Sequence, residues 1–151
     1  DSDLVMKVLG ESRQCLVASP ALLKQHAPLH VPADLYAMPS VDLGGPQRDH
    51  AWQLDGPNGA AVVVPHMPRL VTDDMMTLRQ AALAGVGVVQ LPTMTIREEF
   101  RSGALLRILP DWAPRPGIIH AVFPSRRGLL PAVRQLIDSL ALQFERLTME
   151  D

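Results

Sequence analysis

The segment that most constrains the fold runs from Arg69 to Pro92, because it holds a strand–helix–strand unit with its own start and stop signals. Thr72 or Asp73 is predicted to cap the helix, since a short side-chain oxygen accepts a hydrogen bond from an unpaired backbone N–H. Gly85 stands where a helix needs a left-handed residue after its last turn. A strand–helix–strand unit with these start and stop signals predicts an α/β domain.

Apolar periodicity and Gly or Pro punctuation predict the remaining elements. Strands are expected at 13–18, 40–43, 51–54, 60–64, 105–109 and 118–123, and helices at 20–26, 95–101 and from 131 onward. Ser19 is the expected cap of the first helix. The last helix carries one apolar stripe with a 3.6-residue period: Val133, Leu136, Ile137, Leu140, Phe144 and Leu147. In the middle helix, Met75, Leu78 and Ala82 fall on one face.

The composition excludes several classes of protein. A length of 151 residues fits one ordinary domain, and no apolar run approaches the roughly 20 residues that cross a bilayer. The net charge of −2, with 14 basic and 16 acidic residues, excludes a nucleic-acid groove on this chain. A single cysteine, Cys15, permits no internal disulfide. It is expected to be a buried small hydrophobe in a cytoplasmic protein.

No constellation of catalytic or metal-binding residues stands out in the sequence. The five histidines, at 26, 30, 50, 66 and 120, have no zinc spacing. No Gly-x-Ser-x-Gly elbow is present, and Gly85-Val-Gly87 lacks the third glycine of a dinucleotide loop. The adjacent Glu98 and Glu99 are expected on a solvated helix surface. The chain is therefore predicted not to be an enzyme and to need no cofactor or metal.

Several motifs in fixed order resemble one known family, the effector-binding domain of LysR-type transcriptional regulators. The longest is the segment 69–92 with its "AGVGVVQLP" ending. The others are "CLVASPALL" at 15–23, "VPADL" at 31–35, "WQL" at 52–54, "GALLRILPDW" at 103–112 and "AVFPSRR" at 121–127. Each motif alone is weak, but the ordered set covers nearly the whole chain.

This resemblance implies an α/β fold like that of type 2 periplasmic binding proteins, with two lobes. The chain would hold one complete lobe plus the C-terminal half of the second lobe. Residues 1–13 are expected to be a crossing segment from lobe I, 14–91 the regulatory lobe II, and 92–151 the returning part of lobe I with its C-terminal helix. A half lobe leaves sheet edges and the apolar stripe of the last helix partly uncovered.

The resemblance also implies a function without catalysis. A small-molecule effector would bind in the cleft between the lobes and act by rearranging the lobes and a homo-oligomer, either a dimer or a tetramer. DNA would be bound only through an N-terminal winged helix-turn-helix, which this chain lacks, and no membrane partner is expected. The alternative is a free solute-binding protein of the same fold, which an export signal upstream would favour. The identity of the effector does not follow from the sequence.

Two loops are the expected ligand contacts under this resemblance. Glycine permits close approach of backbone N–H groups, and a helix N-terminus favours anions. For Asp73 and Asp74 the alternative is an acidic pair that only stabilises the helix through its dipole. The residues expected to bind the ligand are Asp42, Leu43, Gly44, Gly45 and Pro46 after the second strand, with Thr72, Asp73 and Asp74 at the helix start.

Overall fold

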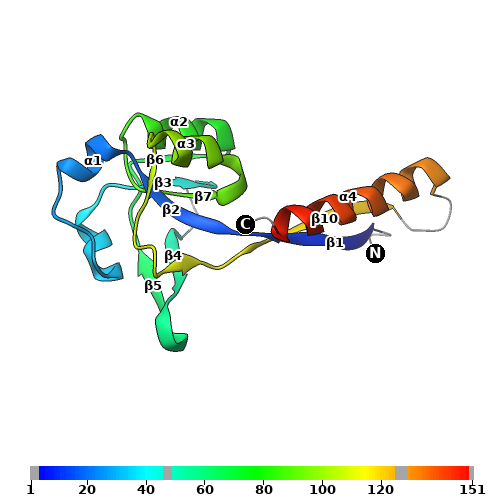
Figure 1. Ribbon diagram of the computed structural model, residues 1–151, viewed down its shortest axis with the longest axis horizontal. Coiled ribbons are helices and arrows are strands. Elements are labelled where there is room, and N and C mark those ends of the chain that lie inside the picture. The colour runs from blue at the N-terminus through cyan, green and yellow to red at the C-terminus, as the bar shows by residue number, and fades with distance from the viewer. Residues whose placement is uncertain (1–3, 46–48, 125–128, 150–151) are drawn as a thin grey trace. The chain divides into compact units, whose positions relative to one another are not determined.

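A computed structural model describes residues 4–45, 49–124 and 129–149 of the chain. The chain divides into two compact units, Gln14–Arg115 and, together, Asp1–Arg13 with Pro116–Asp151. Their elements are labelled in Figure 1. The predicted lobe boundaries at residues 13/14 and 91/92 concern the two-lobed domain and stay a prediction.

The larger unit is built on a central strand with antiparallel neighbours. β2 (Gln14–Ala18) lies between β7 (Val89–Pro92) and β8 (Leu106–Arg107). A second, parallel pair consists of β3 (Val41–Leu43) and β6 (Leu70–Thr72), and a parallel bridge from Ser40 to Val88 connects the two groups of strands. Helices α2 (Met75–Leu83) and α3 (Arg97–Ser102) lie on one side of these strands (Figure 1). Val17, Leu78, Val89 and Ile96 belong to the buried cluster of this layer.

A three-stranded antiparallel sheet completes the larger unit. It consists of β5 (Ala61–Pro65), β4 (Ala51–Asp55) and β9 (Ala113–Pro114), in that order. Polar and apolar residues alternate along β4, so Trp52 and Leu54 are buried at 1% exposure while their neighbours face solvent. With Leu16 they form a second core cluster. The short helix α1 (Pro20–Lys24) and the 3₁₀ helices η1 (Pro32–Ala37), η2 (Pro57–Gly59) and η3 (Thr93–Thr95) complete the connections.

The smaller unit is one long ribbon with one helix. β1 (Leu4–Ser12) pairs antiparallel with β10 (Gly117–Pro124), and α4 (Pro131–Met149) packs against β1. Leu9, Phe123 and Ile137 are buried between ribbon and helix. The predicted partial exposure of the helix stripe is confirmed at Leu136, which is 57% exposed.

The predicted elements agree with the structure to within a few residues, with two exceptions. The strand expected at 105–109 is reduced to the two residues of β8, because Leu109 has a positive φ of 47° that ends the extended backbone. The helix expected at 95–101 begins at Arg97, after the separate 3₁₀ turn η3. Gly85 and Gly103 do adopt the left-handed conformation that ends a helix, with φ of 73° and 78°.

The predicted cap of α2 was wrong by one or two residues. Asp74, not Thr72 or Asp73, is the cap: its Oδ2 accepts hydrogen bonds from the backbone N of Thr77 at 3.0 Å and from Thr77 Oγ1 at 2.6 Å. Thr72 Oγ1 instead accepts from the backbone N of Asp74 at 3.1 Å. On the predicted face, Leu78 and Ala82 are buried, but Met75, the first residue of the helix, is 36% exposed.

The identity of the cap leads to a matched pair of variants. Asp74→Ala is expected to lower the urea midpoint of unfolding, because the Thr77 N–H then loses its acceptor. Asp73→Ala should leave the midpoint nearly unchanged, since this exposed side chain makes no hydrogen bond to any residue that the structure describes. An equal decrease of the urea midpoint in both variants would contradict this assignment of the cap.

The expected solvated pair at Glu98 and Glu99 is corrected for one of its members. Glu98 is exposed and pairs with Arg101. Glu99 is only 6% exposed and forms an ion pair with Arg79, which connects α3 to α2. Since both partners lie on neighbouring helices, this pair is a tertiary contact that spacing along one helix does not reveal. Cys15, as expected, is a buried hydrophobe at 3% exposure, and its burial raises the pKa of the thiol.

Candidate functional site

The two loops expected to bind a ligand lie side by side in the structure. β3 and β6 are parallel, with Leu43 paired to Thr72, so both strands end at the same edge. The backbone N of Gly44 donates to the carbonyl oxygen of Thr72 at 2.9 Å and joins the loops directly. Carboxyl ends of parallel strands next to a helix N-terminus are the usual ligand edge of an α/β unit. Pro46 lies outside the residues that the structure describes.

The predicted residues at this edge differ in how freely each could contact a ligand. Asp73 is exposed, and its side chain makes no hydrogen bond or ion pair with the described residues. Asp74 instead caps the helix, and its hydrogen bonds from Thr77 hold the pKa of its carboxyl below the usual value. Gly44 has a φ of 127°, which a side chain rarely adopts. A Cβ added at Gly45 would meet nothing within 4 Å. Asp73 and Gly45 are therefore the positions that can be changed without disturbing the fold.

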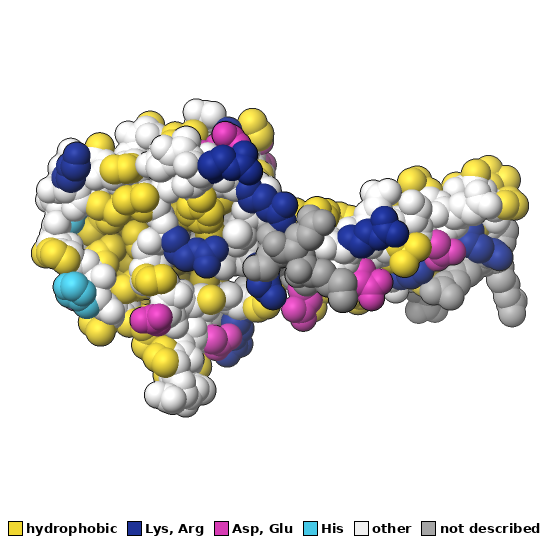
Figure 2. All heavy atoms as spheres, viewed as in Figure 1, with side chains coloured by type: hydrophobic (Ala, Val, Ile, Leu, Met, Phe, Trp, Pro, Cys, Tyr) yellow, Lys and Arg dark blue, Asp and Glu magenta, His cyan; other side chains and the backbone are white. Residues whose placement is uncertain are grey.

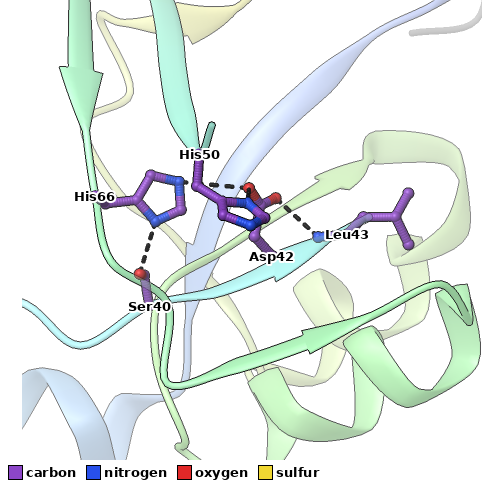
Figure 3. A network of polar contacts seen from close by, with 5 residues as sticks. All are labelled: Ser40, Asp42, Leu43, His50 and His66. Carbon is purple, nitrogen blue, oxygen red and sulfur yellow. Dashed lines mark hydrogen bonds and ion pairs between the residues drawn. The ribbon is translucent and has the colours of Figure 1, made fainter. Parts of the chain in front are cut away.

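Asp42 turns toward the protein rather than away from it (Figure 3). Its Oδ1 accepts from the backbone N of Leu43 at 2.8 Å, and its Oδ2 accepts from His50 Nδ1 at 2.6 Å. His66 Nε2 is 3.6 Å from the same Oδ2, and His66 Nδ1 is 2.7 Å from Ser40 Oγ. We refer to Ser40, Asp42, His50 and His66 as the aspartate–histidine cluster.

Both imidazoles of the aspartate–histidine cluster are buried. The side chains of His50 and His66 are 9% and 7% exposed. The indole of Trp52 stacks on His66 with ring centroids 3.8 Å apart and planes 9° from parallel. Burial lowers the pKa of His66; the Asp42 charge opposes that shift and His50 adds to it. Among the described residues, the buried Nε2 atoms of both histidines have no hydrogen-bond partner.

Sequence reasoning missed His50 and His66 because it tested histidines only for metal spacing. The register of the β4–β5 hairpin contains the missing signal. Ala51 pairs with Pro65, so one more step outward places His50 opposite His66. The backbone N of His66 does donate to the carbonyl oxygen of His50 at 3.0 Å. Two histidines placed symmetrically about a hairpin turn therefore predict neighbouring imidazoles.

Two concave surfaces border this region within the larger unit. The first, of about 680 Å³, is mostly apolar and is lined by Asp49, His50, Ala51, Pro65, His66, Met67, Pro68 and Val71. The second, of about 410 Å³, is lined by Asp49, Ala51, Gln53, Gln90 and Arg115. Both have the size of small-molecule sites. In the part of the chain that is described, no group of three or more His, Cys, Asp or Glu residues is arranged to hold a metal ion.

These features describe an α/β unit with two concave surfaces of small-molecule size, and the comparison with protein families identifies which kind of domain it is. The family of the LysR substrate binding domain matches residues 1–145. The chain therefore belongs to the LysR-type transcriptional regulators and matches their effector-binding domain. The predicted family is thereby confirmed. No described helix has the length and apolar character that a membrane span requires.

Named relatives agree with this assignment. The transcriptional regulator PtxR of Pseudomonas aeruginosa is 30% identical over 140 residues, which cover 93% of this chain and 45% of PtxR. The transcriptional activator AaeR of Escherichia coli K12 is 28% identical over 144 residues, covering 95% of this chain and 46% of AaeR. The chain thus spans about half the length of the curated relatives it matches. These relatives are transcriptional regulators and not enzymes.

Solved structures confirm the predicted fold class. The regulatory domain of AphB from Vibrio vulnificus superposes with a TM-score of 0.74 at 27% identity, over 95% of this chain and 70% of that domain. The regulatory domain of CrgA from Neisseria meningitidis gives 0.77 at 22% identity, over 95% and 71%, and supports the fold alone. The mixed α/β fold is therefore that of LysR-type regulatory domains, of which this chain covers a part.

Proposed function

We propose that this domain binds a small-molecule effector at the shared edge of β3 and β6. The observation that carries the proposal is the hydrogen bond from Gly44 N to Thr72 O, because it holds both loops beside the N-terminus of α2. Of the eight residues predicted to touch the effector, Asp73 and Gly45 support the proposal best, since neither is needed for the fold. Asp74 contributes mainly as the helix cap.

The proposed mechanism is a shift between conformations. An effector that binds one relative orientation of the two lobes more tightly than another increases the population of that orientation. In a homodimer or homotetramer, this change would reposition the DNA-binding heads of the full-length regulator. The DNA contact itself belongs to those heads, because the present chain has a net charge of −2. The proposal places the protein in the cytoplasm, where its operator lies.

The test uses two variants of the full-length regulator, Asp73→Ala and Gly45→Val. A thermal-shift screen of metabolites first identifies a stabilising effector, and operator binding is then measured with and without it. Each variant should raise the half-maximal effector concentration about tenfold, because a lost charged contact or a filled space removes about 1.4 kcal/mol of binding. Operator affinity without effector should stay unchanged.

The matched control is Asp111→Ala, which removes another exposed aspartate of the same unit. It should leave the effector response at the wild-type value. If Asp73→Ala and Gly45→Val respond like this control, the effector binds elsewhere and the proposed site is wrong.

A further inference from the structure

The aspartate–histidine cluster joins β3, which ends at the proposed effector edge, to the β4–β5 hairpin, which is not part of that edge. Asp42 lies at β3, whose end borders the proposed effector edge, and His50 and His66 stand at the open end of the β4–β5 hairpin. The hydrogen bond from His50 Nδ1 to Asp42 Oδ2 spans the connection between β3 and β4. The conformation of β3 at the effector edge therefore depends on a contact with the hairpin.

We propose that His50 and His66 are positioning residues for the effector edge: they hold the carboxylate of Asp42 inward and thereby fix the residues that follow it. This inference rests on the proposed function for its biological meaning. Asp42 then acts within the fold and not as a direct ligand contact. The effector would then contact Gly45 and Asp73, while the carboxylate of Asp42 points away from that surface toward His50.

Hydrogen-bond chemistry assigns a role to each ring nitrogen. An ionised carboxylate only accepts, so His50 Nδ1 must carry the proton that faces Asp42. The same argument favours a proton on His66 Nε2, which faces Asp42 at 3.6 Å, and then His66 Nδ1 accepts from the Ser40 hydroxyl. At 3.6 Å the second contact is electrostatic and not a hydrogen bond. His50 is thus the main support of Asp42, and His66 the weaker one.

The burial of polar atoms in the aspartate–histidine cluster lowers the stability of the fold. The Nε2 atom of His50 is buried and has no partner among the described residues. Unsatisfied buried polar atoms destabilise a fold and are uncommon without a role. The cluster retains them while it keeps a carboxylate and two imidazoles packed against Trp52. The hydrogen bond from His50 to Asp42 is the contact that these buried polar groups make possible, which favours a positioning role for them.

Acidification should destabilise the aspartate–histidine cluster, and the direction of this effect follows from the pKa of His66. Its pKa is lowered by burial, with Asp42 opposing and His50 reinforcing the shift, so the folded protein prefers His66 neutral. The stability that this group contributes is complete above its ordinary pKa of about 6.5 and is lost as the pH falls below that value. A protonated His66 would also have to donate from Nδ1, and the Ser40 hydroxyl would need another acceptor.

Conservative variants separate positioning from simple packing. An asparagine amide reaches about the place of an imidazole Nδ1, and a glutamine amide about the place of Nε2. His50→Asn should therefore keep the hydrogen bond to Asp42, whereas His50→Gln should lose it. Hydrogen–deuterium exchange of the segment 41–45 in the 151-residue chain measures the consequence. We expect exchange about tenfold faster in His50→Gln and near the wild-type rate in His50→Asn.

Two further measurements make the result decisive without any effector. In nitrogen-15 spectra of the histidines, His50 should carry its proton on Nδ1, and His66 on Nε2. As the pH is lowered below about 6.5, the thermal midpoint of the wild type should fall more steeply than that of His66→Gln. Equal exchange in the two His50 variants, or a His50 proton on Nε2, overturns the positioning role. These outcomes are independent of Asp73→Ala and Gly45→Val, so the two proposals fail separately.

Discussion

The 151-residue chain is expected to sediment as a dimer or larger species at low micromolar concentration. In its smaller unit, β1 and β10 form a two-stranded ribbon whose face away from α4 is apolar and exposed. Met6 and Val122, directly paired on that face, are 62% and 56% exposed. Hydrophobic side chains also reach the surface along α4, between charged ones (Figure 2). Burying about 400 Å² of apolar surface favours association by about 10 kcal/mol before entropic costs.

A polar pair on the same ribbon tests the cause. The double variant Met6→Lys with Val122→Glu places opposite charges on paired residues of the exposed face and leaves the side facing α4 unchanged. It should shift sedimentation toward the 16.5 kDa monomer. Met67→Glu is the control, since Met67 is 94% exposed in the larger unit and should not affect association. A wild-type chain that is a compact, cooperatively unfolding monomer would contradict the prediction.

Gly87→Ala is expected to destabilise the larger unit strongly, by about 3 kcal/mol or more. A Cβ on Gly87 would lie 2.8 Å from Cα and N of Ser40 and 2.9 Å from the carbonyl carbon of Pro39. These are backbone atoms, so no flexible side chain can move aside. The clash falls on the bridge in which Val88 N donates to Pro39 O at 2.8 Å, and that bridge connects the two groups of strands.

Gly103→Ala provides the comparison for this prediction. Gly103 has a φ of 78° but nothing within 4 Å of an added Cβ, so only backbone strain of about 1–2 kcal/mol is expected. Urea unfolding of both variants measures the difference. If Gly87→Ala lowers the free energy of unfolding no more than Gly103→Ala does, the two groups of strands separate easily and the steric explanation is wrong.

Much of the larger unit is determined by signals that act within a few residues along the chain. Ser19 caps α1 through a bond to Leu22 N, as expected, because both groups lie within one helical turn. Gly85 ends α2 since only glycine adopts its φ without strain. The alternation in β4 predicts which residues are buried, because successive side chains point to opposite faces. These local rules, with the ordered motifs, were sufficient to identify the family.

The sequence by itself determined most of the elements, the family and the two loops that form the candidate site, since each depends on neighbouring residues or on the order of motifs. Only the tertiary structure decided how side chains at that site are used. Asp42 turns inward because His50 approaches it, and Glu99 is buried because Arg79 of another helix pairs with it. The steric need for Gly87, likewise, arises from the backbone of Ser40. Such contacts join residues eight or more positions apart, beyond the range of the local signals that cap a helix or alternate along a strand.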